Sequence, residues 1–366
     1  MVERRYIAIV FGLTALLVLA ISAVNYMVNP LGIYAEPHIR GFNDVHPAAD
    51  NYVRLLKIES VKHLKPDAVI IGTSRAETGL DPKPEFFPGM TPYNFAVPAA
   101  GIIEQRRMLE FAQAVHPLKM AVLTLDFFAF NARRLENRAY DPGRLSPEAT
   151  AQPRSFFDTY GTLVALDTFI ASIKHLRALR KGKPYDDTAP NGHKISAGVA
   201  AQVAQEGAGK RFRHPPNESE IAVDDFSFSY TKTPGDTTFQ HLEAMLDFAR
   251  RHDIRVILLI SPAHETYLET LEKTGKKPLV EQWMSRVAAI NRDSAARYGA
   301  KPYPLWDFSG RGRFTTEAVP LLADKTAHPK WFWDSNHYKI ELGDIVLRRI
   351  MGMDNGESPD FGKRLD

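Results

Sequence analysis

Three residues near the two ends of this chain have the types and order needed for acyl transfer. Ser74 follows the apolar segment Ala68–Ile71 within Gly-Thr-Ser-Arg, and Asp334 lies three positions before His337 near the C-terminus. A serine hydroxyl becomes an effective nucleophile when an imidazole accepts its proton, and a carboxylate holds that imidazole in the required tautomer. The sequence therefore contains a candidate Ser-His-Asp set.

Each of the two motifs also has an explanation without chemistry. An Asp three positions before a His occurs by chance in chains of this size. Thr73 or Ser74 is alternatively the cap of the helix that follows, accepting a backbone N–H. The order of the residues favours chemistry, because the serine follows the first strand of an α/β pattern and the Asp and His precede its last helix.

The N-terminal segment is long and apolar enough to cross a membrane. Tyr6 to Val28 includes no charged residue, and about 23 residues at 1.5 Å each cross a bilayer core. A cleaved signal peptide has an apolar region of roughly 7 to 15 residues and a small-residue cleavage site. Neither fits here, so we expect an uncleaved anchor within residues 1–30.

The charges that flank this segment predict its orientation. Arg4 and Arg5 lie just before the span, and positive residues favour the cytoplasmic side. We therefore expect a single-pass protein of the inner (cytoplasmic) membrane, with its N-terminus in the cytoplasm. Residues 31–366 are then expected in the periplasm or outside the cell.

Composition excludes several kinds of site. The chain has no cysteine, which excludes disulfides and thiolate metal ligands. A net charge of +3 with 24% charged residues gives no electrostatic argument for nucleic acid as a partner. No glycine-rich nucleotide-binding loop is visible. We expect neither a metal ion nor a cofactor.

Apolar patterning after the anchor predicts strands and helices in alternation. Strands are expected over residues 68–71, 93–97, 120–125, 255–260 and 303–306, and helices over 51–64, 101–115, 238–252, 279–298 and 340–351. Such a pattern predicts a three-layer α/β/α fold with a parallel sheet, whose functional residues lie beyond the carboxyl ends of the strands. Five polar residues occupy these positions: Ser74, Asn94, Asp126, His264 and Asp307.

Residues 135–235 interrupt the alternation. Pro, Gly, Ser and charged residues are frequent there, residues 156–179 are partly helical in pattern, and residues 191–216 show little sustained periodicity. We expect this segment to be an insertion that caps or flanks the site.

The two motifs and the strand order resemble the SGNH/GDSL hydrolase superfamily. The residues that carry the likeness are Ile71-Gly-Thr-Ser-Arg75 and Asp334-Ser-Asn-His337. With its single anchor, the chain is similar to the membrane-anchored cell-envelope acyltransferase branch, which includes alginate O-acetylation proteins and the teichoic-acid D-alanylation protein. The likeness covers roughly residues 50–350 without the insertion.

This resemblance implies a role for each member of the candidate set. Ser74 is expected to be the nucleophile, His337 the general base and then acid, and Asp334 the orienting carboxylate. Thr73 stands where the superfamily usually has Asp, a change that the envelope branch also tolerates.

The glycine and asparagine blocks that supply oxyanion donors in the superfamily have no clean match here. The Ser74 N–H is one expected donor, the Gly101 region is a second candidate, and Asn94 or Asn131 is a candidate side-chain donor. Such donors stabilise the negative charge that develops on the substrate oxygen. For Asn131, a helix cap is an equal alternative.

Four further residues are candidates for substrate binding: Arg75, His264, Trp331 and Trp333. The alternative for Arg75 is a surface pair with Glu77 at a helix start. His264 follows the strongest predicted strand, in a loop where an imidazole faces either substrate or solvent. Sugar rings dock on aromatic faces, and Trp331 and Trp333 share a face in an extended segment, with core packing as the equal alternative.

Two hypotheses follow. The first is an SGNH-type O-acyltransferase or carbohydrate esterase that forms an acyl-Ser74 intermediate and moves acyl groups, with acetyl expected, to or from a cell-surface polysaccharide. Coenzyme A thioesters are not expected outside the membrane, so the resemblance implies a multi-span membrane acyltransferase as acyl donor. The second is a non-catalytic polysaccharide-binding or assembly subunit of an exopolysaccharide complex, which the incomplete oxyanion blocks favour and the intact Ser, His and Asp oppose.

Overall fold

The computed structural model of this chain describes residues 2–34, 39, 42–43, 49–133, 140–150, 160–182, 187–213, 225–353, 356 and 358–366. Its α-helices are α1 (Val2–Val28), α2 (Ala49–Leu64), α3 (Ser74–Gly79), α4 (Ile102–Val115), α5 (Thr162–Val164), α6 (Leu166–Lys181), α7 (Ala197–Glu206), α8 (Ala208–Arg213), α10 (Phe239–Arg251), α11 (Glu265–Lys273), α12 (Lys277–Arg297) and α13 (Ile340–Ile350). Its strands are β1 (Ala68–Ile71), β2 (Pro92–Asn94), β3 (Met120–Leu125), β4 (Asp187–Thr188), β5 (Lys194–Ile195), β6 (Arg255–Ile260), β7 (Leu305–Asp307) and β8 (Lys363–Arg364).

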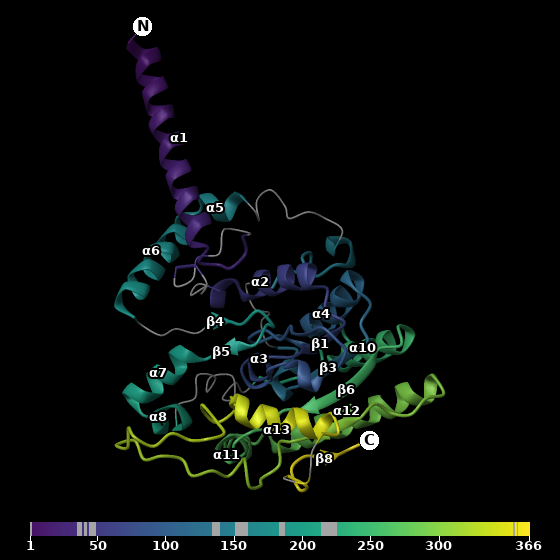
Figure 1. The fold of residues 1–366 in the computed structure, drawn as a ribbon. Helices are drawn as coiled ribbons and strands as arrows, with labels where there is room; N and C mark the ends of the chain where they lie inside the picture. Colours follow the sequence, from purple (N-terminus) through teal and green to yellow (C-terminus); the bar gives the residue numbers. More distant parts are fainter. Residues whose placement is uncertain are drawn as a thin grey trace.

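A six-stranded sheet lies at the centre of the domain (Figure 1). The strand order is β2-β1-β3-β6-β7-β8, and all described pairs are parallel except β7 with β8. The order reverses between β1 and β3, and ligands of open α/β sheets bind in the crevice at such a reversal. The segments that follow β1 and β3, which begin the candidate site, therefore lie side by side.

Helices cover both faces of this sheet. Val69 and Ile71 of β1 belong to an apolar cluster with residues of α2, α4, α10 and α12, whereas Ala68 and Ile70 belong to a second cluster with residues of α13 and the end of α3. Strands buried on both faces have continuous apolar sequences, and for this reason the strands could be predicted from the sequence. The prediction of a mixed α/β fold with a mostly parallel sheet is confirmed.

Three details of the sheet differ from the prediction. The strand expected over residues 303–306 covers Leu305–Asp307. The second strand ends at Asn94 rather than continuing to Val97, because the Asn94 side chain turns to bind carbonyl groups of the neighbouring helix α3. Strand β8 was not predicted. Its two residues, Lys363 and Arg364, are too few and too polar to produce a pattern.

The part of the insertion that the structure describes is more regular than its sequence suggested. Within residues 191–216, helices α7 and α8 are present. Helix α7 is rich in alanine, so helix propensity rather than apolar periodicity forms it. The β4–β5 hairpin lies against the edge strand β2, where Asn94 donates its backbone N–H to the Asn191 carbonyl at 2.8 Å. Gly192 has φ +83°, and a Cβ there would lie 2.2 Å from the Asn94 carbonyl oxygen.

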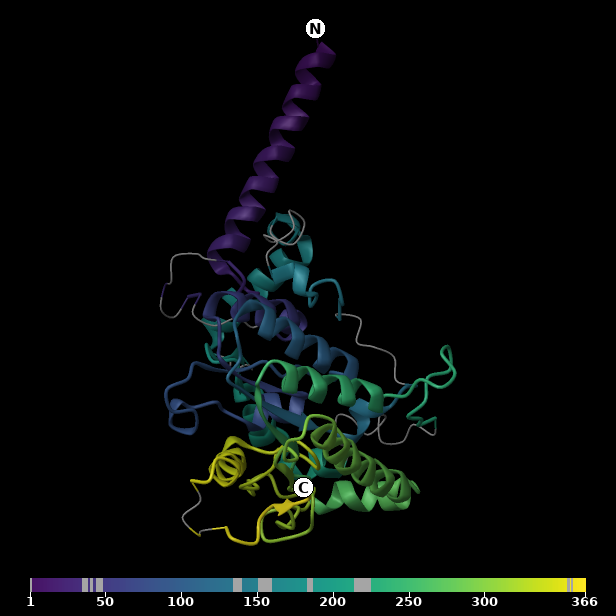
Figure 2. The same cartoon turned by 90° about the vertical axis from the view of Figure 1, so that its right-hand side faces the viewer.

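Helix α1 projects away from the domain (Figures 1 and 2). Among the described residues it is the one helix that is long and apolar enough to cross a membrane. Its last turn is docked on the domain, where Asn25 and Val28 are buried.

Candidate active site

Ser74 occupies the first turn of α3, immediately beyond the carboxyl end of β1. Thr73 is the N-cap of this helix, and its Oγ1 accepts the Arg75 N–H at 3.3 Å. Capping therefore belongs to Thr73, and the hydroxyl of Ser74, which is partly exposed, is left for another partner.

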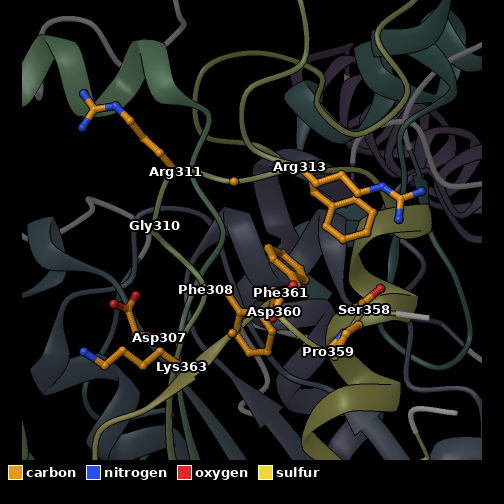
Figure 3. A pocket seen from close by; sticks show the side chains of 13 residues that line it. Asp307, Phe308, Gly310, Arg311, Arg313, Ser358, Pro359, Asp360, Phe361 and Lys363 are labelled. Carbon is orange, nitrogen blue, oxygen red and sulfur yellow. The ribbon is translucent and has the colours of Figure 1, made fainter. Parts of the chain in front are cut away.

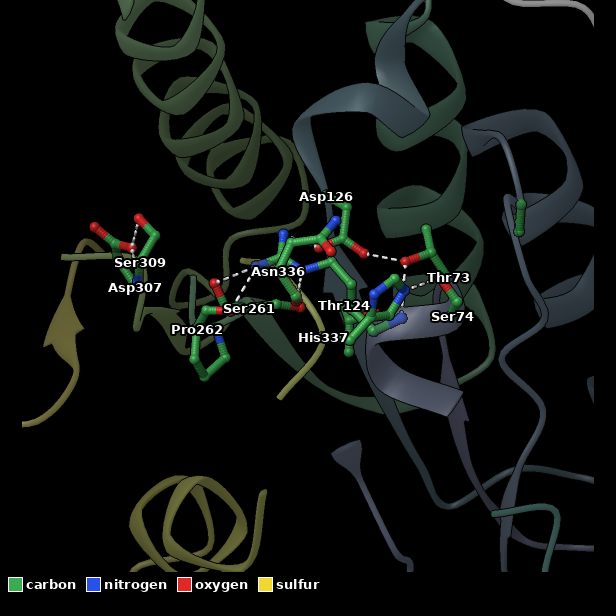
Figure 4. A network of polar contacts seen from close by, with 12 residues as sticks. Thr73, Ser74, Thr124, Asp126, Ser261, Pro262, Asp307, Ser309, Asn336 and His337 are labelled. Atoms are coloured by element: carbon green, nitrogen blue, oxygen red, sulfur yellow. Dashed lines mark hydrogen bonds and ion pairs between the residues drawn. The ribbon is translucent and has the colours of Figure 1, made fainter. Parts of the chain in front are cut away.

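That partner is His337, 263 positions along the chain. The Ser74 Oγ lies 2.9 Å from His337 Nε2 (Figure 4). His337 Nδ1 lies 3.0 Å from both carboxylate oxygens of Asp334. Asp334 is completely buried, whereas the imidazole is 17% exposed. Consecutive contacts thus connect the buried Asp334 carboxylate, through the His337 imidazole, to the partly exposed Ser74 hydroxyl.

The loop that carries Asp334 and His337 is tightly closed. The Asp334 Oδ1 accepts backbone N–H groups of Asn336 and His337 at 3.1 and 2.9 Å, which forms an Asx turn. Trp333 donates its N–H to the His337 carbonyl at 2.8 Å. These bonds hold the carboxylate and the imidazole in one fixed geometry.

The protonation state of Asp334 follows from its surroundings. Burial favours the neutral acid, but His337 and the backbone N–H donors outweigh burial and lower the pKa of Asp334 below its ordinary value. An ionised carboxylate only accepts hydrogen bonds, so Nδ1 of His337 carries a hydrogen and Nε2 is free to accept from Ser74. This is the tautomer that general-base activation requires.

Arg75 was predicted to bind substrate, with a surface pair to Glu77 as the alternative; it is buried, so the surface-pair alternative is wrong. Its Nη1 donates to Asp126 Oδ1 at 2.9 Å while its Nε donates to the Asn336 carbonyl at 3.0 Å. Its Nη2 donates to carbonyls of the loop that follows β6. Arg75 thus joins the loops after β1, β3 and β6 to the loop of Asp334, and its three side-chain nitrogens all bind acceptors within the protein.

Glu77 and Asp126 complete the support beneath α3. Glu77 is buried and lies 3.2 Å from the Lys57 ammonium of α2. The hydroxyl of Thr73 donates to Asp126 Oδ2 at 2.5 Å (Figure 4). Because Asp126 binds both Thr73 and Arg75, the two residues that flank Ser74 are anchored to the same carboxylate.

The insertion also contributes an arginine to the site. The Nη2 of Arg211, in α8, lies 3.4 Å from Asp334 Oδ2 and its Nη1 donates to Gln202 at 2.9 Å. The next residue, Phe212, packs edge-on against the His264 ring. The segment expected to cap or flank the site therefore supports it from the carboxylate side.

The structure separates the candidate oxyanion donors. Asn94 is buried, its amide donates to the carbonyls of Ala76 and Leu80 at 2.9 and 2.7 Å, and it is therefore a structural residue. The side-chain carbonyl of Asn131 accepts N–H groups of two other backbone positions and closes a turn.

Two backbone groups remain available as donors. In the described part of the chain, the N–H groups of Ser74 and Gly101 have no intramolecular acceptor. Gly101 precedes α4 in the loop whose Val97 donates its N–H to the Gly72 carbonyl at 3.2 Å. That contact brings the Gly101 loop beside the serine turn.

Of the other three residues predicted to bind substrate, one is buried and two are partly exposed. His264 is fully buried rather than exposed in a loop: it caps α11, and its two ring nitrogens contact Thr266 Oγ1 at 2.9 Å and the Glu317 carbonyl at 2.8 Å. It therefore does not face substrate. Trp331 and Trp333 are both partly exposed, and a lysine ammonium lies over each ring at 4.2 and 4.3 Å.

The two tryptophans differ in what they pack against. Trp331 contacts the Phe314 ring edge-on and joins the apolar core on the α13 side of the sheet, whereas Trp333 is not part of that cluster. Glu317 accepts the N–H groups of residues 330–332 and holds this segment. Burial raises the pKa of Glu317, and those N–H groups oppose the effect.

A cavity of about 440 Å³ lies next to this aromatic segment and is separate from Ser74, His337 and Asp334. Phe308, Phe314 and Phe361 line it, with Arg311 and Arg313 at its rim (Figure 3). Arg311 is paired with Glu272 at 3.2 Å. The cavity lining includes none of Ser74, Asp334 and His337.

Sequence reasoning missed two supporting residues, Arg211 and Asn336. Arg211 lies in a segment without apolar periodicity, and the role of Asn336 is carried by its backbone carbonyl, which has no sequence signal. The described residues contain no group of three or more His, Asp or Glu that could hold a metal ion. No protein-family model matches the chain, and no curated protein shows significant similarity to it.

Proposed function

We propose that this protein is a membrane-anchored serine acyltransferase or esterase of the SGNH kind. The observation that carries the proposal is the line of contacts from Ser74 Oγ to His337 Nε2 at 2.9 Å and from His337 Nδ1 to Asp334 at 3.0 Å. A nucleophile, a base and an orienting carboxylate within hydrogen-bond distance are the parts that covalent acyl transfer requires.

The reaction proceeds in two balanced steps. Ser74 Oγ attacks the carbonyl carbon of the acyl donor as its proton passes to His337 Nε2, and the leaving group departs with that proton. The acceptor hydroxyl then attacks the acyl-serine, gives its proton to His337, and Ser74 is released with its hydroxyl restored. The N–H of Ser74, with that of Gly101 as the second candidate, stabilises the oxyanion in both steps.

The acceptor in this proposal is a hydroxyl of a cell-surface polysaccharide or exopolysaccharide, or water in the esterase case. Trp333, one position before Asp334, is the candidate aromatic surface for a sugar ring. The acyl donor is a multi-span membrane acyltransferase, in keeping with the superfamily resemblance.

Topology is part of the same proposal. We place the N-terminus in the cytoplasm and the domain in the periplasm, because Arg4 and Arg5 precede the apolar segment of α1. An alkaline phosphatase fusion at the C-terminus is expected to be active. An active cytoplasmic reporter at the same position would overturn this topology.

Labelling with a fluorophosphonate tests the chemistry. The full chain in detergent is expected to react at one serine, with peptide mapping to Ser74 and loss of the adduct in Ser74→Ala. The matched control is Ser309→Ala, whose serine bonds to Asp307 away from the triad and which should label fully. A folded wild-type protein that does not label would overturn the proposal.

That negative result would favour a second function, a non-catalytic polysaccharide-binding or assembly subunit. The Asn94 amide donates to the carbonyls of Ala76 and Leu80 and is therefore not available as an oxyanion donor, which favours this second function. Binding of an oligosaccharide without turnover, measured by calorimetry, would then be expected.

A further inference from the structure

Helix α6 buries polar side chains on one face and exposes apolar side chains in its N-terminal turns. Thr168, Ser172 and His175, spaced along one face of the helix, are buried. Leu166 and Ile170, on another face, are 64% and 46% exposed. A surface helix of a water-soluble domain has the opposite arrangement.

The polar face of α6 binds the end of α1. Asn25, which is fully buried in the last turns of α1, donates its amide to the Leu163 carbonyl at 2.7 Å and accepts from the Ser172 hydroxyl at 3.0 Å. Figures 1 and 2 accordingly place α5 and the start of α6 beside the domain end of α1. The exposed apolar residues are therefore fixed next to the point where the apolar helix leaves the domain.

Exposed apolar residues also continue along α5. Val164 is 48% exposed, and neither it nor Leu166 or Ile170 belongs to the apolar clusters of the described core. Cations follow toward the C-terminal end of α6: Lys174, Arg177, Arg180 and Lys181. The one acidic residue of α6, Asp167, accepts a hydrogen bond from the Tyr52 hydroxyl at 2.8 Å.

We propose that the outward faces of α5 and α6 form a membrane-contact surface, seated in the interface of the bilayer that α1 crosses and recognising anionic phospholipid. Interfacial helices bury an apolar face at the level of the headgroups and direct Lys and Arg to the phosphates. Continuity with α1 and the charge of α6 both favour lipid over a protein partner. The surface holds the domain in one orientation on the membrane. This proposal depends on α1 being a membrane anchor and does not depend on acyl transfer.

The absence of cysteine makes this surface directly measurable. Single cysteines at Leu166 and Ile170 are labelled with an environment-sensitive fluorophore in the full chain, reconstituted into vesicles of phosphatidylcholine and phosphatidylglycerol. Leu16, exposed in the middle of α1, reports insertion of the anchor. Leu321, 71% exposed in the segment between β7 and α13, is the control for an exposed apolar site outside α1, α5 and α6.

Nitroxide quenchers near the headgroups are expected to quench positions 166 and 170 at least about twofold more than position 321. Quenchers deep in the acyl chains should quench position 16 most. If position 16 is quenched but positions 166 and 170 are quenched no more than position 321, the membrane-contact surface is overturned and the anchor is retained. Absence of quenching at 16 as well would overturn both.

Neutralising cations tests the lipid preference. In the double variant Lys174→Gln/Arg177→Gln, quenching at position 166 should fall in vesicles with phosphatidylglycerol and stay unchanged in pure phosphatidylcholine. Equal quenching of the parent and the variant in both kinds of vesicle would overturn the recognition of anionic lipid.

Discussion

Gly343 of α13 lies directly against the carbonyl group of Gly79 in α3. A Cβ at Gly343 would fall 1.6 Å from the Gly79 carbonyl oxygen, and a Cβ at Gly79 would fall 2.0 Å from the Tyr338 ring. Helix α3 begins at Ser74 and α13 follows the loop of His337, so this backbone contact sets the spacing between Ser74 and His337.

Substitution Gly343→Ala is therefore expected to impair both stability and activity. The added methyl group overlaps backbone that has no room to move, which costs about 1 to 3 kcal/mol of unfolding free energy. Separation of α13 from α3 also lengthens the contact between Ser74 and His337. Urea unfolding and p-nitrophenyl acetate hydrolysis measure the two effects.

The matched control is Gly310→Ala, because a Cβ at Gly310 meets open space. This variant should keep both properties. Equal behaviour of the Gly343 and Gly310 variants would contradict the spacing role of the glycine contact.

The triad is expected to act as one unit. Ser74→Ala and His337→Ala should each lower kcat at least about a thousandfold without loss of the folded state, and Asp334→Ala should also nearly abolish turnover. The double variant Ser74→Ala/His337→Ala should be little worse than either single one. Steady-state kinetics with thermal melting as the folding control checks this, and additive losses would argue against a shared mechanism.

Arg211 is expected to support the Asp334 carboxylate from the insertion. A hydrogen bond to a charged group contributes about 1.5 kcal/mol, so Arg211→Met should lower kcat about tenfold with a smaller change in KM. Arg211→Lys should recover part of the loss. The neighbouring Lys210, paired with Glu206 on the surface, supplies the control Lys210→Met. Equal kcat and KM values for Arg211→Met and Lys210→Met would show that Arg211 does not support Asp334.

His193 makes stability depend on pH. Burial lowers the pKa of His193 below 6.5, and its Nε2 lies 3.0 Å from the Thr78 carbonyl of α3. The neutral ring is favoured in the folded state, so its contribution is complete above about pH 6.5 and is lost as the pH falls toward the lower folded-state pKa. Charges of Lys57, Glu77 and Asp81 also act on this ring.

Urea unfolding at pH 7.5 and 5.5 compares wild type with His193→Gln. The wild type should lose more unfolding free energy on acidification than the variant, by up to about 1.4 kcal/mol, because pH 5.5 lies one unit below the ordinary histidine pKa. Identical losses would show that this histidine does not titrate in that range.

The two tryptophans should separate acyl transfer from packing. Trp333→Ala is expected to reduce transfer to an oligosaccharide while sparing hydrolysis of p-nitrophenyl acetate, because positioning of an acceptor hydroxyl against water is worth up to about 7 to 11 kcal/mol. Trp331→Ala should reduce both rates, since Trp331 packs against Phe314 and the core. Equal loss of both activities in Trp333→Ala would make that ring structural as well.

The sequence alone determined the alternation of helices and strands, the apolar N-terminal helix and the order of Ser74, Asp334 and His337 along the chain. These features follow from local patterning. A strand buried on both faces is a continuous apolar run, and an amphipathic helix repeats every 3.6 residues, so each is legible within its own segment.

Only the tertiary structure decided which side chains meet. Ser74 and His337 are 263 positions apart, and Arg211 reaches Asp334 from a helix formed by propensity without an apolar pattern. Arg75 and His264 became internal because their partners are backbone carbonyls and a carboxylate of distant loops, and hydrogen-bonding partners of that kind leave no trace in residue type or spacing.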